Sequence, residues 1–341
     1  MFATPPEQNH ALFTGVLSNG VVTTLGKIGE GLTRLSHDVH FVTPALFTSL
    51  PCPTYPEIRL SVLPYAGVRR QFETFAPDAV HIATEGPLGL AARRYCLKRN
   101  IAFTTAFHTR FAEYVHARIR VPVDLTYRWL RNFHAPSSAV MVPTPSVQRE
   151  LQDRGFTNTF AWTRGVDTVT FCPGERDALK SRRPIFLYVG RVAVEKNIEA
   201  FLKLDLPGTK WVCGEGPSRA QLERRYPHVH FAGIQTAAQL ARYYRAADVF
   251  VFPSRTDTFG LVMLEALACG TPVAAYPVLG PIDIIGQSGA GALHENLGVA
   301  CMQALDISRN KARAYAEQFS WQTSVNQFVS HLAPVAARKA A

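Results

Sequence analysis

Short runs of β-branched and aromatic residues recur along the chain, and longer stretches with apolar residues at helical spacing separate them. Apolar runs of four or five residues are typical of strands that are buried on both faces, and alternation with helices indicates parallel sheets. The pattern predicts strands at 38–42, 79–83, 101–105, 139–142, 185–189, 211–213, 229–231, 249–252 and 273–275.

The stretch 163–184 interrupts this rhythm with Gly165, Pro173, Gly174 and a charged run, as expected of an interdomain linker. We therefore predict an α/β fold with two Rossmann-like domains that face each other across a cleft. The expected segments are a first domain at 1–162, the linker at 163–184, a second domain at 185–307, and C-terminal helices at 308–332 that pack across the domain junction. In such sheets ligands bind beyond the carboxyl ends of the strands.

The composition supports two well-packed domains, because 341 residues with 47% hydrophobic content can bury a large core. No apolar run reaches the roughly 18 residues of a membrane span, and the first residues do not resemble a secretory signal, so we expect a cytoplasmic protein. The six cysteines form no C-x-x-C pair. We expect buried free thiols rather than a zinc site or a disulfide framework.

The net charge of +10 indicates an anionic partner, which could be nucleic acid, a membrane surface or a phosphorylated substrate. Much of the excess lies in 91–131, where only Glu113 and Asp124 oppose the basic residues. Trp129 and Phe133 among the arginines predict reversible, peripheral docking on anionic lipid, and a soluble anionic acceptor is the alternative. Nucleic-acid binding is disfavoured because no binding module is visible. The basic residues of this segment are Arg93, Arg94, Lys98, Arg99, Arg110, Arg118, Arg120, Arg128 and Arg131.

The most specific motif places Asp257 eight residues before Glu265, between a predicted strand and a glycine-containing turn at Gly270. We expect a helix to start near Thr258, with Asp257 as its N-cap and Glu265 roughly 12 Å further along the axis. Free N–H groups at such a helix start can bind phosphate oxygens. The alternative is that one carboxylate is only a cap and the other a surface residue.

Three further motifs follow or precede predicted elements. Gly190-Arg191 follows a strand, and Lys196 comes five residues later, so the two cations could clamp a diphosphate; a solvated turn is the alternative. His108 follows a strand of the first domain and could face the same cleft, although a lone histidine is usually structural. Asn19-Gly20 opens the first long helix, where glycine permits close approach of a ligand, and a plain turn explains it nearly as well.

Together these motifs resemble the family-four retaining glycosyltransferases, whose two-Rossmann-domain architecture is called GT-B. The resemblance runs from about Gly20 to Trp321 and includes the phrases at 143–146, 164–167 and 214–217. It implies an N-terminal acceptor-binding domain and a C-terminal domain that binds a nucleotide sugar. It also implies transfer with retention, in which the leaving phosphate takes the acceptor's proton, so that no protein nucleophile is needed.

The resemblance assigns roles to individual residues. Glu265 should bind the nucleotide ribose, Asp257 the donor sugar, Arg191 and Lys196 the diphosphate, and His108 the sugar near the reacting carbon. The full donor-binding set is Gly20, Gly190, Arg191, Lys196, Asp257, Thr258, Phe259, Gly260, Leu261 and Glu265, the catalytic set is His108, Arg191, Lys196 and Asp257, and the acceptor set is Asn19, Gly20, His108 and Arg110. No cofactor and no metal are expected, since D-x-D is absent.

Two departures from the family pattern stand out. The family's usual E-x7-E is D-x7-E here, and the clean first strand is replaced by a Pro-containing start in which 12–17 would have to serve as the strand. The second departure keeps open a sugar-nucleotide-binding protein with impaired transfer. For an active enzyme we expect a UDP-glucose-like donor first, GDP-mannose second, and a lipid or carbohydrate acceptor of the cell envelope.

Two other enzyme classes are excluded by their missing motifs. A dehydrogenase requires G-x-G-x-x-G after the first strand, whereas the glycines at 26–31 lie within a predicted helix and the phrase at 214–216 lacks the third glycine. A serine hydrolase requires G-x-S-x-G, and the sequence at 286–290 fails at its last position.

Overall fold

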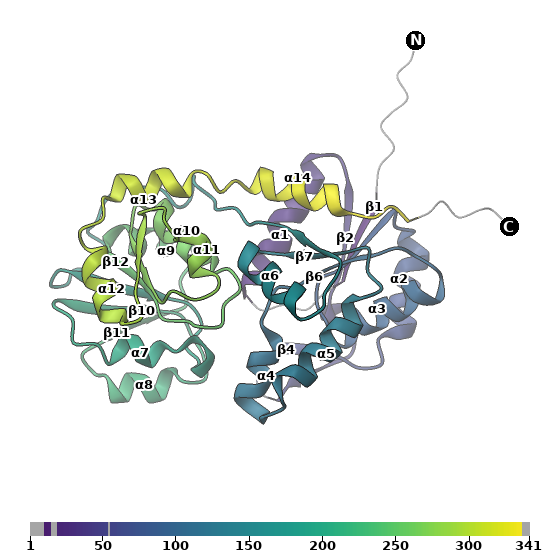
Figure 1. The fold of residues 1–341 in the computed structure, drawn as a ribbon, viewed down its shortest axis with the longest axis horizontal. Helices are drawn as coiled ribbons and strands as arrows, with labels where there is room; N and C mark the ends of the chain where they lie inside the picture. The colour runs from purple at the N-terminus through teal and green to yellow at the C-terminus, as the bar shows by residue number, and fades with distance from the viewer. Residues whose placement is uncertain (1–9, 15–18, 54, 336–341) are drawn as a thin grey trace, which may run out of the picture. The chain divides into compact units, whose positions relative to one another are not determined.

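The computed structural model describes residues 10–14, 19–53 and 55–335 of the chain (Figure 1). It divides into two compact units, which we call unit 1 and unit 2. Unit 1 comprises Met1–Thr163 together with Trp321–Ala341, and unit 2 comprises Arg164–Ser320. Unit 2 is thus one continuous segment, whereas unit 1 is built from both ends of the sequence.

Among its described residues, unit 1 contains a six-stranded parallel sheet with the strand order β2-β1-β5-β6-β7-β8. A separate antiparallel pair, β3 with β4, follows the second strand. The strands are β1 (His10–Thr14), β2 (Asp38–Val42), β3 (Ser49–Cys52), β4 (Tyr55–Ser61), β5 (Ala79–Ile82), β6 (Thr104–Ala106), β7 (Ala139–Val142) and β8 (Thr159–Ala161). The helices are α1 (Asn19–Arg34), η1 (Pro44–Leu46), α2 (Tyr65–Phe75), α3 (Pro87–Lys98), α4 (Phe111–Ile119), α5 (Val123–His134), α6 (Pro145–Asp153) and α14 (Trp321–His331).

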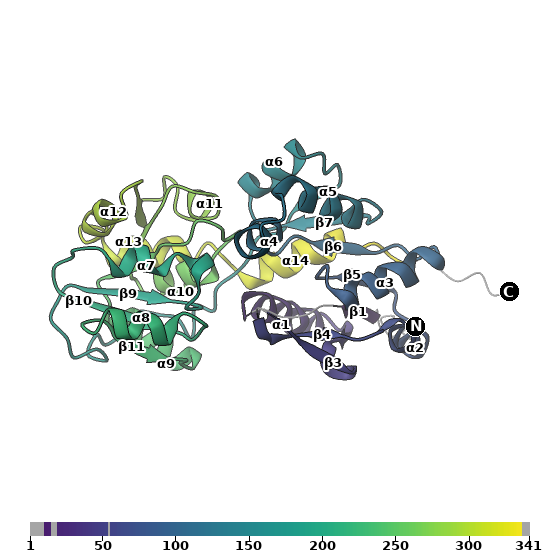
Figure 2. The same ribbon diagram turned by 90° about the horizontal axis from the view of Figure 1, so that it is seen from below.

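The two faces of the unit 1 sheet are covered by different helices. α1 and α14 form one apolar cluster with Met141 and Trp162, and α2, α3 and α5 form another with Val80 and Ile82. Figures 1 and 2 show α14 beside α1. The two helices approach closely at Gly31, where an added Cβ would lie 2.3 Å from a methyl group of Val325. A side chain at this glycine would separate the helices.

Unit 2 has the same architecture, with the strand order β11-β10-β9-β12-β13-β14 and parallel pairing throughout its described sheet. Its strands are β9 (Ile185–Val189), β10 (Thr209–Cys213), β11 (His230–Gly233), β12 (Val249–Phe252), β13 (Val273–Ala275) and β14 (Gly291–Leu293). Its helices are η2 (Val194–Lys196), α7 (Ile198–Leu202), α8 (Arg219–Arg225), α9 (Ala237–Ala246), α10 (Leu261–Ala268), α11 (Pro281–Ile284), α12 (Leu297–Ala304) and α13 (Arg309–Ala316).

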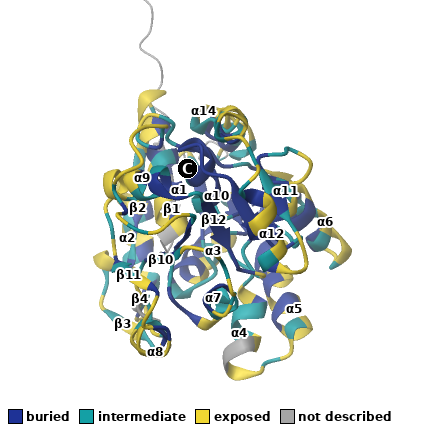
Figure 3. Ribbon diagram, turned by 90° about the vertical axis from the view of Figure 1, so that its left-hand side faces the viewer, coloured by how far each residue is buried: buried dark blue, intermediate teal, exposed yellow. Residues whose placement is uncertain are grey.

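Alternate residues of the unit 2 strands enter two different cores, as the two-residue period of a strand requires. Leu187 and Phe250 pack with α9, α10 and α13, whereas Phe186 and Val251 pack with α7, α8 and α12. Both faces are therefore buried, and Figure 3 shows these strands mainly in dark blue. This explains why the sequence has continuous apolar runs rather than alternating ones.

Most predicted strands agree with the structure to within a few residues, but the first strand differs from the expectation. The family-like strand expected at 12–17 is β1, which begins at His10, ends at Thr14, and pairs with both β2 and β5. Residues 15–18 lie outside the described part of the chain. The altered N-terminus therefore still supplies the first strand of the sheet.

The segment expected as a linker packs on unit 2. Val166, Phe171 and Leu179 belong to its core, and the guanidinium of Arg313 on α13 donates to the carbonyls of Thr168 and Phe171. The helical segment expected at 308–332 consists of two helices that belong to different units, α13 to unit 2 and α14 to unit 1.

The six cysteines are unpaired in the structure, and four of them are buried, as expected. Among the described residues, no helix is both long and apolar enough to cross a bilayer.

Candidate functional site

The topology of unit 2 places its switch point between β9 and β12, because β10 and β11 extend the sheet on one side and β13 and β14 on the other. Loops that follow the two strands at a switch point diverge and leave room for a ligand. The loop after β9 carries Gly190, Arg191 and Lys196, and the loop after β12 carries Asp257. The fold therefore brings two separate sequence motifs to one edge of one sheet.

Glycines hold the loops after β9 and β10 together by direct backbone contact. A Cβ at Gly214 would lie 1.9 Å from the carbonyl oxygen of Gly190, and one at Gly216 would lie 2.3 Å from that of Val192. The Val192 N–H donates to the carbonyl of Glu215 at 2.8 Å. No residue with a side chain fits these two positions without moving the loop that carries Arg191.

Three contacts tie the loop after β9 to the loop after β12. The Lys196 ammonium is paired with the Asp257 carboxylate, the Asn197 amide donates to the Pro253 carbonyl at 3.0 Å, and the Thr256 hydroxyl donates to the Glu195 carbonyl at 3.2 Å. The second Asp257 oxygen, Oδ2, is buried and has no hydrogen-bond partner among the described residues. An unsatisfied buried acceptor of this kind fits a ligand hydroxyl, which would donate to it.

The start of α10 differs from the prediction. Asp257 is not an N-cap: the helix begins at Leu261, and Gly260 occupies the N-cap position with φ of 88°. Glu265 therefore lies about 6 Å along the axis from Leu261, the first helical residue. Because the residues before Leu261 form an irregular loop, the helical rise does not set the distance between Asp257 and Glu265. Thr258 and Phe259 in this loop are buried.

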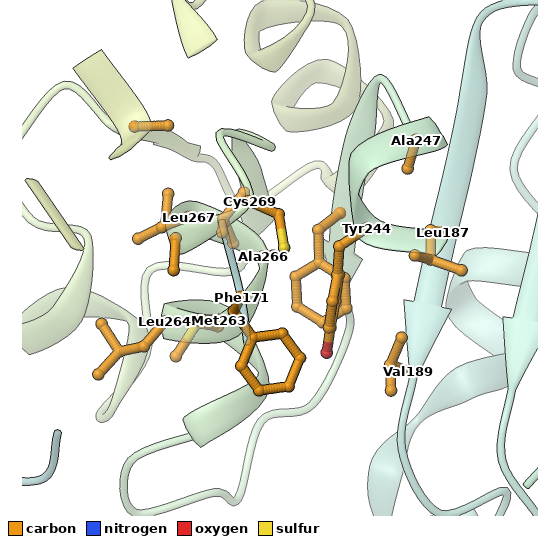
Figure 4. Close-up of a cluster of buried hydrophobic side chains, with 14 of the residues drawn as sticks. Phe171, Leu187, Val189, Tyr244, Ala247, Met263, Leu264, Ala266, Leu267 and Cys269 are labelled. Carbon is orange, nitrogen blue, oxygen red and sulfur yellow. The ribbon is translucent and has the colours of Figure 1, made fainter. Parts of the chain in front are cut away.

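Glu265 lies in the second turn of α10 and is not a surface residue. The buried hydroxyl of Tyr244 on α9 donates to its Oε2 at 3.0 Å. Burial raises the pKa of Glu265 to about 7, although the hydrogen bond from Tyr244 opposes the rise. Figure 4 shows the Tyr244 ring among the apolar side chains of the unit 2 core. The carboxylate is thus held in place at an energetic cost to the folded protein.

The sequence did not single out Tyr244, nor the residues that fix its backbone. Its carbonyl accepts a hydrogen bond from the Thr271 hydroxyl, and the Arg309 guanidinium reaches that hydroxyl at 3.1 Å and the Arg245 carbonyl at 3.0 Å. Burial lowers the pKa of Arg309 to about 10. No short motif connects these residues, because they lie on α9, α13 and a turn after α10.

In unit 1, His108 lies just after β6, as predicted, and is partly buried. Its ring meets the ring of Trp162 edge to face, with centroids 5.6 Å apart. Trp162 is fully buried, and its indole N–H donates to the Ser324 carbonyl of α14 at 3.2 Å. The C-terminal helix therefore supports the aromatic surface on which His108 rests.

The other acceptor candidates are Arg110, which is held in ion pairs, and Asn19 with Gly20 at the start of α1. Arg110 bonds the carboxylates of Glu113 at 2.7 Å and Glu150 at 2.8 Å. Burial acts to lower the pKa of Arg110, but the two carboxylates outweigh it and the pKa is raised. Asn19 and Gly20 open α1, and an added Cβ at Gly20 would meet no atom within 4 Å.

Two arginines of the basic segment 91–131 make contacts within unit 1. Arg93 donates to the carbonyls of Asn132 and Phe133, and the Arg94 guanidinium lies over the ring of Tyr65, so part of the charge is used in packing. Phe133 is only 3% exposed, and its prediction as a membrane contact is wrong because its ring faces the core. Trp129 is 40% exposed.

Helices α4 and α5 form a largely apolar groove of about 340 Å³ around Trp129. Four large apolar side chains of these helices are exposed, namely Phe111, Ile119, Leu125 and Trp129. Arg120 and Arg128 lie exposed on the same two-helix segment, together with Asp124, which pairs with Arg154. The lining residues are Phe111, Val115, Val121, Leu125, Thr126 and Trp129.

Comparison with known proteins identifies the class of this fold and site. A family described as "Glycosyltransferase Family 4" matches residues 18–170, and one described as "Glycosyl transferases group 1" matches residues 183–305. The chain belongs to these glycosyltransferases, which have the GT-B fold, and it is an enzyme that transfers a sugar.

Individual relatives agree with this assignment. A GDP-mannose-dependent alpha-mannosyltransferase of Corynebacterium glutamicum is 27% identical, with 94% of this chain and 86% of the relative covered. A GDP-mannose-dependent alpha-(1-6)-phosphatidylinositol dimannoside mannosyltransferase of Mycobacterium tuberculosis is 28% identical, with 96% and 95% covered. The structure of sucrose-phosphate synthase from Thermosynechococcus elongatus has the same fold, with a TM-score of 0.77, 20% identity, and 95% of this chain and 98% of that chain covered.

Proposed function

We propose that the protein is a retaining, metal-independent hexosyltransferase that moves a sugar from a nucleotide diphosphate donor to a lipid or other cell-envelope acceptor. The observation that carries the proposal is the gathering of Arg191, Lys196, Asp257 and Glu265 around one switch point of unit 2. Two cations there match the charge of a diphosphate, and two carboxylates match hydroxyl groups of the sugar and the ribose.

In this proposal each side chain has a role that follows from its chemistry. Arg191 and Lys196 neutralise the negative charge that grows on the leaving diphosphate, which removes the need for a divalent cation. Asp257 accepts a hydrogen bond from a sugar hydroxyl at Oδ2, and Glu265 accepts hydrogen bonds from the ribose hydroxyls. Donor binding requires Lys196 to share its charge between the diphosphate and Asp257, so the ion pair seen here would be loosened by the donor. His108 of unit 1 contributes at the reacting carbon.

The names of the relatives reverse the order of donors expected from the sequence. Both curated relatives described above are named as GDP-mannose-dependent, so we propose GDP-mannose as the first donor and UDP-glucose as the second. One of them is named for a phosphatidylinositol-based acceptor, which supports an acceptor with a sugar or polyol headgroup on a lipid.

A thermal-shift titration with each donor tests the donor site. A ligand at a hundred times its dissociation constant stabilises the folded state by about 2.7 kcal/mol, and K196A should abolish that stabilisation. K203A removes an exposed lysine of the same unit and should leave it unchanged. An undiminished response of K196A would remove Lys196 from the donor site.

The reaction itself is tested with GDP-mannose in buffer that contains EDTA. Turnover without added metal and an α-configured product, read by NMR of the anomeric proton, are expected. A strict requirement for magnesium or manganese, or a β-configured product, would contradict the proposal. A protein that binds the donor but neither transfers nor hydrolyses it would be a sugar-nucleotide-binding protein.

We place the contact with an anionic bilayer at the groove between α4 and α5. Exposed Ile119, Leu125 and Trp129 can enter the acyl boundary, while Arg120 and Arg128 remain at the level of the phosphates. This combination of apolar centre and cationic flanks is complementary to anionic lipid and does not match a neutral, fully polar partner.

Vesicle sedimentation tests this surface with phosphatidylglycerol and phosphatidylcholine vesicles at low and high salt. R128A should weaken binding to phosphatidylglycerol about fivefold, because one arginine near such a surface contributes about 1 kcal/mol. L125S should weaken it as well, whereas L50S, which changes an equally exposed leucine on β3, should not. Equal binding to both lipids, or equal effects of the two serine variants, would refute the placement.

A further inference from the structure

Glu85 occupies the switch point of unit 1, and no motif in the sequence marks it. The strand order places β1 beside β5, with β2 on one side and β6, β7 and β8 on the other. The chain continues from Ile82 at the end of β5 through Glu85 to α3, which begins at Pro87. Glu85 therefore lies at the edge of the sheet where parallel α/β folds bind their ligands.

The backbone that carries Glu85 is held rigidly. Gly89 in the first turn of α3 packs directly on the loop, and an added Cβ there would lie 1.9 Å from the carbonyl oxygen of Thr84. Binding residues on such fixed loops lose little conformational entropy when a ligand binds. The loop between β5 and α3 thus presents Glu85 in one position.

The carboxylate of Glu85 is oriented from behind by a buried histidine. His134, the last residue of α5, is 1% exposed, and its Nε2 lies 3.2 Å from Glu85 Oε1. Since a carboxylate only accepts hydrogen bonds, Nε2 carries the proton and donates it. The other ring nitrogen, Nδ1, lies 2.9 Å from the Thr105 hydroxyl of β6.

This arrangement continues into the interior. The Thr105 hydroxyl reaches the Ser137 hydroxyl at 3.2 Å, and the Asn158 amide donates to the Ser137 carbonyl at 2.7 Å. A chain of buried polar groups therefore fixes the imidazole, and through it one oxygen of the carboxylate. Buried networks of this kind are costly unless they are fully bonded, so the orientation of His134 is well determined.

Among the residues that the structure describes, no side chain bonds the front of the carboxylate. The Glu85 side chain is 17% exposed, and among the described residues His134 is its only polar contact. A glutamate that served only to stabilise the fold would gain more stability from an arginine or lysine partner. Glu150 of the same unit has such a partner in Arg110. A partly exposed acceptor with one oxygen anchored is suited to hydroxyl groups, which donate hydrogen bonds.

We propose that Glu85 binds hydroxyl groups of a polyol or sugar acceptor, and that His134 is the positioning residue that holds its carboxylate. The inference rests on the proposed transfer function, and it assigns the acceptor's hydroxyl-bearing headgroup to the switch point of unit 1.

The test compares transfer with donor hydrolysis, because only transfer needs the acceptor. With GDP-mannose as donor, the wild type is first assayed with four acceptors, namely methyl α-mannoside, myo-inositol, glycerol, and phosphatidylinositol in phosphatidylglycerol vesicles. The acceptor that it glycosylates fastest is the probe for the variants. E85Q should raise the KM of that probe about 10- to 100-fold and leave donor KM and donor hydrolysis unchanged. The control E73Q makes the same change at an exposed position on α2.

A double-mutant cycle tests the role of His134. H134A should raise the acceptor KM as E85Q does, H134Q should restore it by supplying an amide donor, and the E85Q/H134A double variant should be no worse than E85Q alone. Thermal midpoints of all variants report on folding, so a purely structural defect would appear as a lowered midpoint with additive effects.

Each outcome decides the proposal. An unchanged acceptor KM in E85Q, an equal loss of transfer and hydrolysis, or a wild type that hydrolyses the donor but glycosylates none of the probes would overturn it. A wild type that neither transfers nor hydrolyses any nucleotide sugar would instead refute the proposed function itself.

Discussion

Replacing Glu265 by glutamine should stabilise the protein above neutral pH while weakening the donor site. The Glu265 side chain is partly buried on α10, and among the described residues its hydrogen-bond donor is the buried Tyr244 hydroxyl. Burial raises its pKa from the usual 4.5 to about 7. The folded chain therefore holds a proton on this group at pH values where the unfolded chain has released it.

The direction and size of the effect follow from that difference. Below pH 4.5 the group is neutral in both states and costs nothing. Between pH 4.5 and 7 the unfolded state loses the proton first, so the stability of the wild type falls, and above about pH 7 the full cost of about 3 kcal/mol is present. E265Q stays neutral, so its stability relative to the wild type should rise by that amount across the same window.

Thermal unfolding of the wild type and E265Q between pH 4.5 and 8.5 measures this difference directly. The pH dependence contributed by other groups cancels when the two curves are subtracted. The control E295Q removes an exposed carboxylate of unit 2, and its difference curve should be flat. A flat curve for E265Q would show that Glu265 ionises as easily in the folded protein as in the unfolded chain, and a curve that falls with pH would show that it ionises more easily in the folded protein; either result would refute the reasoning.

Two further substitutions have matched controls. Donor affinity should rise with pH as Glu265 ionises, and Y244F should shift this rise to higher pH, because loss of the Tyr244 hydroxyl removes a hydrogen bond that lowers the pKa of Glu265. Y243F, on the same helix, should leave the pH profile unchanged, and an unchanged profile in Y244F would refute the coupling. G31A should destabilise unit 1 by about 1–3 kcal/mol through contact with Val325, while G26A on the same helix should stabilise it by about 0.5–1 kcal/mol because nothing lies near; equal Tm values for the two would contradict the close packing.

The sequence predicted the parts of the fold that depend on local pattern. Strands such as β9 and β12 were recognised because each is a run of apolar residues buried on both faces. The three-residue strands β8 and β14 were missed, because their pairing depends on neighbours far away in the sequence. The start of α10 was predicted too early because Asp257 resembles an N-cap, whereas the helix begins only after Gly260.

In the candidate site, too, local motifs could be predicted from the sequence and contacts between distant residues could not. Arg191, Lys196 and Asp257 were found because they occur in short motifs next to strands, and the strand order then brings them together. Tyr244 and His134 could not be found in this way. Each acts by touching a carboxylate that is distant in sequence, and such a contact exists only once helices have packed.

The way the chain closes unit 1 has a consequence for its synthesis. The carbonyl of Thr163 accepts a hydrogen bond from Ser324, and the buried face of Trp162 is completed by Phe328. During translation all of unit 2 is synthesised before α14. Until α14 has been made, the rest of unit 1 exposes the apolar surface that this helix covers in the folded protein. A stop codon or a proteolytic cut just before Trp321 would therefore damage the half of the molecule that was made first.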